Sequence, residues 1–339
     1  MKVYEAKEIR NIAFIGSSGS GKTLLTESLL FQSGAINRRG SVEDGNTVSD
    51  FVEIEHEKGY SVFAAPVYLE WKDTKINILD TPGSDDFVGE TINSLYAADA
   101  AAIIVNAVNG PEFGTDIAVH RNKEIHKPFM FIVNKMDGDQ VDFEKVLGEM
   151  KDSYGTKVAP VQIPLGHGNN FNKVIDLLRM KLLEFTPDGK YTESEIPANE
   201  KGKAEEIRNT LVEAIAESDE ELMAKYFDEG DLTQEELAGG FKKAFLNGEV
   251  YPVLFASSKL GIGISSLLDY FVSNVPSAAE FIYKTQSGKE VKVDSKAQTS
   301  LFIYKMYSDP KLGDMTYFKV ISGSISSGME LVNHSRGSA

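Results

Sequence analysis

Residues 16–23 read Gly-Ser-Ser-Gly-Ser-Gly-Lys-Thr, which fits the pattern G-x-x-x-x-G-K-[ST] of a phosphate-binding loop. Glycine lets such a loop wrap closely, so that its backbone N–H groups point at the phosphates. The Lys22 ammonium would then reach the outer phosphates, and the Thr23 hydroxyl would bind Mg²⁺. The pattern predicts a nucleoside triphosphate site formed by Gly16, Ser17, Ser18, Gly19, Ser20, Gly21, Lys22 and Thr23.

A second short motif, Asp80-Thr81-Pro82-Gly83, follows an apolar run. The Asp80 carboxylate could hold Mg²⁺ through water, and the Gly83 amide could contact a γ-phosphate. Alone, four such residues also fit an ordinary strand-to-turn transition. Their place on the strand after a phosphate loop favours the nucleotide site, with Lys22 and Gly83 as candidate catalytic groups.

The stretch Asn134-Lys135-Met136-Asp137 fits the pattern N-K-x-D. The Asp137 carboxylate can accept two N–H bonds from guanine, whereas adenine presents no such pair of donors. The wrong base would leave a buried carboxylate unpaired, so the motif predicts GTP rather than ATP. We expect Lys135 to pack over the base and Asn134 to brace the phosphate loop.

Each motif follows a predicted strand. Apolar runs end near residues 15, 80, 133 and 255, and they alternate with helical periodicity after residue 23 and over 87–98, 112–126 and 142–153. This alternation predicts a doubly wound α/β sheet with ligands at the carboxyl ends of its strands. Ser257 and Ser258 follow the last of these strands, where their backbone suits a contact to the guanine oxygen. Residues 33–60 show no sustained periodicity, as expected of a disordered segment or a functional switch.

The rest of the chain predicts further units. We expect the nucleotide-binding domain over 1–154 and 251–276, and an inserted α+β subdomain over 155–250 with helices at about 199–216, from Ser218 and from Thr233. Ser218 with Glu221, and Thr233 with Glu236, have the spacing of capping boxes. A linker over 277–297 and the first strands of an incomplete β-barrel domain over 298–339 would follow.

Composition narrows the function classes. The chain has 51 Asp and Glu against 35 Lys and Arg, a net charge of −16, which argues against general nucleic-acid binding. It contains no cysteine, so a disulfide framework and a cysteine-based metal site are excluded. No run of membrane-spanning length and no signal peptide is evident, and we expect a cytoplasmic monomer without a membrane partner.

At this point the sequence resembles the translational GTPases, and within them elongation factor G, the ribosomal translocase. Residues 50–61 read D-F-V-E-I-E-H-E-K-G-Y-S, close to that family's first switch, D-W-M-E-x-E-x-E-R-G-I-T. Residues 164–166, 174–177, 180–181 and 220–226 are similar to its extra subdomain, and 316–323 to the start of its second-domain barrel. The resemblance implies GTP and GDP with Mg²⁺ as ligands, Ser61 as a further Mg²⁺ ligand, the ribosome as partner, and an N-terminal fragment of a longer protein.

The departures from the family pattern concern the position of the water-orienting histidine and the residues that flank it. In the family the phosphate loop is G-H-V-D-A-G-K-T, and a histidine after D-T-P-G orients the attacking water; Ser84 stands at that position here. The two apolar positions that flank this histidine in the family are Ser18 and Tyr60. Ser84 is therefore a candidate catalytic position that lacks the usual group, because a serine is too short to reach where an imidazole would.

Two functional hypotheses remain open on sequence. The first is a translocation factor that hydrolyses GTP on the ribosome, slowly because of Ser84. The second is a GTP-dependent ribosome-binding switch with little hydrolysis, in which the nucleotide state orders residues 38–60. A related ribosome-protection or release-type factor is a further alternative.

Overall fold

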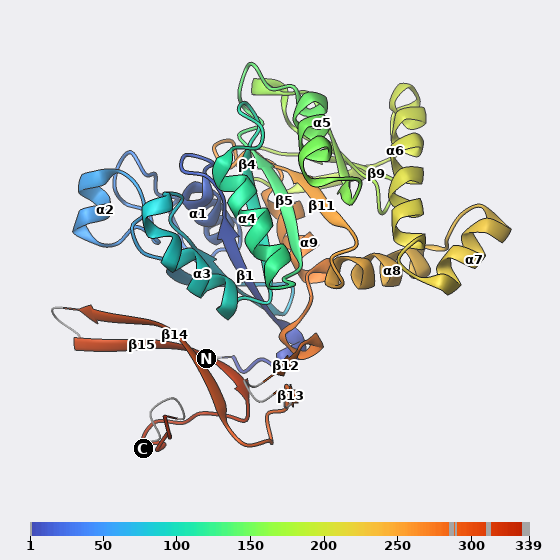
Figure 1. Cartoon of the computed structure of the whole chain (residues 1–339). Coiled ribbons are helices and arrows are strands. Elements are labelled where there is room, and N and C mark those ends of the chain that lie inside the picture. The colour runs from blue at the N-terminus through green and yellow to red at the C-terminus, as the bar shows by residue number, and fades with distance from the viewer. Residues whose placement is uncertain (1, 285–287, 289, 310–312, 334–339) are drawn as a thin grey trace.

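The central sheet is built from seven strands in the order β2-β3-β1-β4-β5-β11-β6. The structure is a computed structural model, and it describes residues 2–284, 288, 290–309 and 313–333 (Figure 1). In sheet order the strands span Ala65–Trp71 (β2), Thr74–Asp80 (β3), Ile9–Ile15 (β1), Ala100–Asn106 (β4), Phe129–Asn134 (β5), Tyr251–Phe255 (β11) and Val158–Pro160 (β6). β2 runs antiparallel to β3, and all other neighbours pair in parallel.

Helices cover both faces of this sheet, which confirms the predicted doubly wound α/β fold. One apolar core lies under α1 (Lys22–Gln32) and α9 (Ile264–Asn274). The other lies under α3 (Val88–Ala97), α4 (Phe113–Glu124) and α5 (Phe143–Tyr154). Every residue of β4 and β5 is buried, because strands covered on both faces need continuous apolar sequence.

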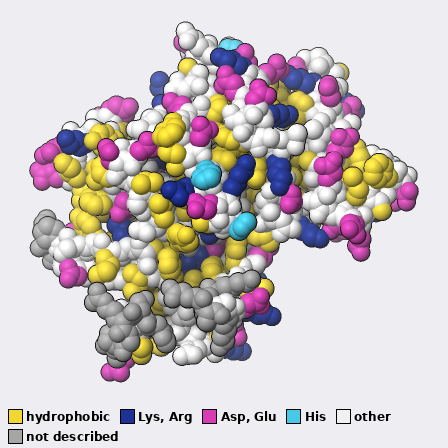
Figure 2. All heavy atoms as spheres, in the orientation of Figure 1, with side chains coloured by type: hydrophobic (Ala, Val, Ile, Leu, Met, Phe, Trp, Pro, Cys, Tyr) yellow, Lys and Arg dark blue, Asp and Glu magenta, His cyan; other side chains and the backbone are white. Residues whose placement is uncertain are grey.

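A second sheet and three helices follow α5 along the chain. The antiparallel sheet has the order β10-β9-β8-β7. Its strands span Gln162–Leu165 (β7), Lys173–Asp176 (β8), Lys181–Phe185 (β9) and Tyr191–Ser194 (β10), and the helices span Ala198–Ala216 (α6), Glu220–Glu229 (α7) and Gln234–Leu246 (α8). On the face shown in Figure 2, acidic side chains gather over α6 and α7. Strand β6 lies within the range predicted for the insert, yet it pairs with β11, so a division at residue 155 separates it from its sheet.

The structure confirms one of the two predicted capping boxes and shows a helix within the segment 33–60. The capping box of Thr233 with Glu236 is confirmed at the start of α8. The box predicted for Ser218 is wrong, because the Asp219 carboxylate caps α7 by accepting two backbone N–H bonds. The segment 33–60 also contains a helix, α2 (Glu53–Lys58), which ends where Gly59 adopts a left-handed conformation at φ 69°.

The C-terminal part forms two antiparallel hairpins below the central sheet in Figure 1. The first pairs β12 (Ile282–Lys284) with β13 (Glu290–Lys292), and the second pairs β14 (Ser300–Asp309) with β15 (Gly313–Ser322). The predicted barrel range 298–339 includes 310–312 and 334–339, which lie outside the described residues. Short 3₁₀ helices span Ala6–Glu8 (η1), Asp85–Phe87 (η2), Gly168–Asn170 (η3) and Ala278–Glu280 (η4).

The β14–β15 hairpin contacts the central domain next to the candidate site. The Lys305 ammonium donates to the Ala64 carbonyl oxygen at 2.6 Å and to Glu90 Oε2 at 3.1 Å. The Tyr307 ring packs against the rings of Phe51 and Phe63. Over the residues that the structure describes, no helix is long and apolar enough to cross a membrane.

Candidate functional site

The loop between β1 and α1 has the geometry that its glycines predict. Gly16, Gly19 and Gly21 adopt φ values of 135°, 74° and 93°, which side chains other than glycine rarely tolerate. A Cβ atom on Gly16 would lie 2.5 Å from the Ile104 carbonyl oxygen, and one on Gly21 would lie 2.5 Å from Asn134 Nδ2. The loop is thus pressed against β4 and against the first residue of the N-K-x-D motif.

Lys22 and Gly83 meet above this loop. The Lys22 ammonium is buried and donates to the carbonyl oxygens of Gly16 and Ser17, each at 2.9 Å. A Cβ atom on Gly83 would lie 2.7 Å from the backbone nitrogen of Ser18 and would overlap the Lys22 ammonium. Glycine at 83 is therefore needed for the D-T-P-G motif to approach the loop. Burial lowers the pKa of Lys22.

Asp80 is a buried carboxylate without a hydrogen-bond partner. It is 1% exposed, and within the part of the chain that the structure describes neither of its side-chain oxygens makes a hydrogen bond. Burial has the largest effect on its pKa and raises it, although the hydroxyls of Ser49 and Thr23 lie close enough to lower it in part. An orphaned buried anion is unfavourable alone, so this position fits a cation.

The Thr23 hydroxyl, which lies near the Asp80 carboxylate, is itself in contact with a second hydroxyl. Thr23 Oγ1 and Ser61 Oγ are 3.1 Å apart, and Ser61 donates to Asp50 Oδ1 at 2.6 Å. In the described part of the chain no group of three or more His, Cys, Asp or Glu could hold a metal ion. One carboxylate with hydroxyls is instead the donor set of Mg²⁺ that shares its coordination with phosphates. Sequence reasoning missed Asp50, whose only signal was its place at the start of the first-switch stretch.

The residues predicted to bind the guanine base converge at the ends of β5 and β11. The Asn134 amide donates to Ser20 O at 3.2 Å and to Ser258 Oγ at 3.1 Å, and its oxygen accepts the Ser258 N–H at 3.0 Å. Ser257 Oγ donates to Asp137 Oδ1 at 2.5 Å. Lys135, between them, adopts a left-handed backbone at φ 66°.

Two buried glutamates organise the segment around α2, and sequence reasoning missed both. Glu27 on α1 accepts the backbone N–H groups of Gly40 at 2.8 Å and Val48 at 2.9 Å. Glu55 on α2 accepts those of Val62 at 2.9 Å and Phe63 at 3.0 Å. In the sequence, each is only a charged residue among apolar neighbours, which is a weak sign of a buried role.

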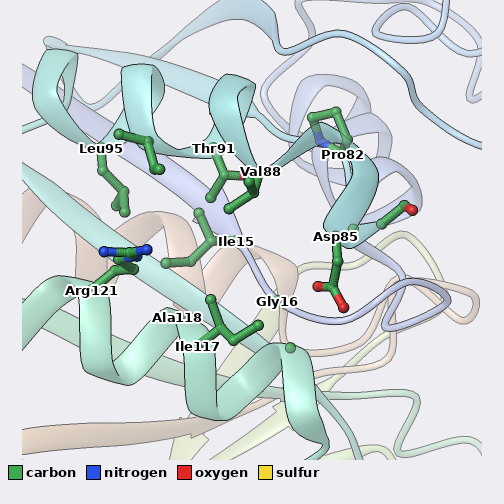
Figure 3. A pocket seen from close by; sticks show the side chains of 14 residues that line it. Ile15, Gly16, Pro82, Asp85, Val88, Thr91, Leu95, Ile117, Ala118 and Arg121 are labelled. Carbon is green, nitrogen blue, oxygen red and sulfur yellow. The ribbon is translucent and has the colours of Figure 1, made fainter.

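Ser84 lies beside the phosphate loop but is engaged locally. Its hydroxyl accepts the Asp86 N–H at 3.4 Å and so caps η2. The Tyr60 ring, 43% exposed, packs on the Phe87 ring with centroids 6.5 Å apart. A cavity of about 30 Å³ is lined by Ser84 and its neighbours, and Figure 3 shows Asp85 at one end of it and Arg121 at the other.

Comparisons with known proteins agree with this geometry. The sequence model of the elongation factor Tu GTP binding domain matches residues 7–277. A relative from Thermotoga maritima, an elongation factor G-like protein, is 34% identical over 332 residues, covering 96% of this chain and 47% of the relative. A crystal structure from Thermus thermophilus superimposes with a TM-score of 0.84 at 32% identity, covering 94% of this chain and 46% of the other. The chain thus spans about half the length of the relatives it matches.

Proposed function

Because this chain belongs to the translational GTPases that share the elongation factor Tu GTP-binding domain, as a divergent member of the elongation factor G group, we propose that it binds GTP with Mg²⁺ and acts on the ribosome in translocation. The observation that carries the nucleotide site is the buried Asp80 carboxylate, which has no hydrogen-bond partner among the described residues, near a loop whose Gly16, Gly19 and Gly21 adopt positive φ. A metal ion bound to phosphates would give that carboxylate the partner it lacks.

The residues have separate proposed roles. Thr23, Ser61 and Asp80 would hold Mg²⁺, which would neutralise charge on the phosphates when bound. Residues 16–22 would hold the phosphates through backbone N–H groups and the Lys22 ammonium. Asn134, Lys135, Asp137 and the backbone of Ser257 and Ser258 form the proposed guanine site.

Hydrolysis is proposed to be slow. Lys22 and the Gly83 amide remain available to stabilise the transferred phosphoryl group. The position that holds a water-orienting histidine in the family carries Ser84, whose short side chain already caps η2. Phosphoryl transfer depends on positioning and electrostatics, so loss of the positioning group lowers the rate while binding persists. The same observation favours a second candidate, a GTP-dependent ribosome-binding switch with little hydrolysis.

We also propose a division into units that follows the pairing of the strands. The nucleotide-binding domain would comprise 1–154 and 251–276 together with β6, and the insert would comprise the remaining residues up to 250. A linker over 277–297 would join this domain to the hairpin region.

Guanine selectivity is tested by competition binding. We expect GTP to bind far more tightly than ATP, because only guanine offers two N–H donors to Asp137. The substitution Asp137→Asn should weaken GTP and favour XTP, since it inverts one hydrogen-bond partner. Equal affinities of the parent for GTP and ATP would overturn the assignment.

Slow hydrolysis is tested by single-turnover GTP hydrolysis with and without ribosomes. We expect weak stimulation of the parent and the largest rate for Ser84→His combined with Ser18→Val and Tyr60→Ile. Ser153→His, at an exposed position on α5, is the matched control and should behave like the parent. Fast ribosome-stimulated hydrolysis by the parent would refute the role given to Ser84.

A further inference from the structure

Arg39 lies in the segment after α1, and its guanidinium holds the loop that follows β11. Its Nη1 donates to the Ser258 carbonyl oxygen at 2.9 Å, and its Nη2 donates to the Lys259 carbonyl oxygen at 2.8 Å. Two nitrogens of one rigid fork thus bind two successive carbonyls, a geometry that a lysine cannot reproduce. The same Ser258 oxygen accepts Ser28 Oγ from α1 at 2.9 Å.

The backbone that carries Arg39 is itself anchored. Gly40, the next residue, donates its N–H to Glu27 Oε1 at 2.8 Å, and Glu27 is 1% exposed. A buried charged acceptor makes a stronger hydrogen bond than a neutral one does. The Arg39 side chain therefore extends from backbone that is tethered to α1 and reaches the loop after β11.

The loop after β11 contacts the N-K-x-D motif, which is predicted to bind the guanine base. Ser257 Oγ donates to Asp137 Oδ1 at 2.5 Å, and the Ser258 N–H donates to Asn134 Oδ1 at 3.0 Å. Backbone hydrogen bonds in both directions between Ser257 and Ile262, at 3.0 and 3.1 Å, close the loop. A continuous set of contacts thus runs from Arg39 through residues 257–259 to the Asp137 carboxylate.

Resting on the proposed guanine site, we propose that Arg39 is a positioning residue for recognition of the guanine base. It fixes the 257–259 loop, and Ser257 on that loop orients the Asp137 carboxylate toward the two N–H donors of guanine. Because Arg39 belongs to the segment that leads to residues 50–61, it also joins the base site to the first switch. Displacement of residues 38–49 would loosen the protein's hold on the base.

The test measures how far Arg39 affects the discrimination between guanine and inosine. Inosine diphosphate lacks the 2-amino group of GDP and so loses one of the two bonds to Asp137. Affinities for GDP and inosine diphosphate would be measured by competition against a fluorescent GDP for the parent, Arg39→Met, Arg39→Lys and Arg38→Met. Arg38 is the exposed neighbour and serves as the matched control.

We expect Arg39→Met to bind GDP about tenfold more weakly, the size of effect that loss of charged hydrogen bonds produces. The ratio of GDP to inosine diphosphate affinity should fall, with partial recovery in Arg39→Lys and no change in Arg38→Met. A role in stability alone would weaken both nucleotides equally, and an unchanged ratio would overturn the assignment of Arg39. A parent that binds neither nucleotide would overturn the proposed function and this inference with it.

Discussion

Two aspartates with the same burial are expected to respond in opposite directions to the same substitution. Asp80 and Asp99 are each 1% exposed. Asp80 has no hydrogen-bond partner among the described residues. Asp99, by contrast, accepts hydrogen bonds from Asn11 Nδ2 at 2.6 Å and from the Tyr283 hydroxyl at 2.8 Å, and it pairs with the Lys319 ammonium. We predict that Asp80→Asn stabilises the nucleotide-free protein and that Asp99→Asn destabilises it.

The magnitudes follow from these contacts. An unsatisfied buried charged group costs roughly 1–3 kcal/mol or more, but asparagine also needs partners and Lys22 loses an attractive neighbour, so the net gain for Asp80→Asn should be about 1–2 kcal/mol. In a domain of this size that raises the unfolding midpoint by about 2–8 °C. Asp99→Asn leaves the buried Lys319 ammonium without its counter-charge and should cost roughly 3–5 kcal/mol.

The assay is unfolding at pH 8 in a metal chelator without nucleotide, followed by the same measurement with Mg²⁺ and GDP. Ligand binding should raise the midpoint of the parent more than that of Asp80→Asn, which keeps the phosphate loop and the base site but loses one Mg²⁺ ligand. Burial raises the pKa of Asp80, so the parent is destabilised at pH values above the unfolded pKa and most fully above the folded one. The advantage of Asp80→Asn should therefore shrink on acidification. A variant less stable than the parent in chelator would refute the reasoning, because it would show that Asp80 has a partner in the nucleotide-free state.

Two further predictions concern the segments around the site. Residues 38–60 should exchange amide hydrogens more slowly with a GTP analogue than with GDP, because Ser61 can bind Mg²⁺ only when this segment closes. Equal protection from hydrogen exchange in the two states would mean that the segment is not a switch. Lys305→Met should increase hydrogen exchange in β14 and β15, because it removes the contact to Glu90. Lys292→Met, at an exposed position, is the control and should not increase it. Unchanged exchange in Lys305→Met would show that this contact does not hold the hairpin.

The sequence was sufficient for the fold because its signals were local and repeated. β5 is buried along its length and apolar from Phe129 to Val133, and the three chemical motifs follow β1, β3 and β5. The phosphate loop, Asp80 and the N-K-x-D motif could be placed together from this order alone. The structure brings the Ser61 hydroxyl within 3.1 Å of the Thr23 hydroxyl, and their binding of Mg²⁺ stays a prediction.

What the sequence could not provide were contacts between segments that have no regular pattern. Glu27 looks like any polar residue on a helix, yet it binds two backbone amides of a distant loop. Arg39 sits in a polar stretch without periodicity, and its partners are backbone carbonyls about 220 residues away, which no side-chain pattern can reveal. The pairing of β6 with β11 was missed because three residues are too few to show a period.

The three positions that depart from the family pattern are linked through one short stretch of backbone. Ser18 lies against Gly83, and the Phe87 N–H donates to the Ser84 carbonyl oxygen at 3.1 Å while the Phe87 ring packs on Tyr60. Position 84 thus lies between Gly83, which contacts Ser18, and Phe87, whose ring packs on Tyr60. Ser84→His alone would therefore leave these neighbouring contacts unchanged. Ser18→Val and Tyr60→Ile should raise the hydrolysis rate most when histidine is present at 84. Rates for the single, double and triple variants should for this reason be non-additive, with the interaction between positions 60 and 84 as the part to measure.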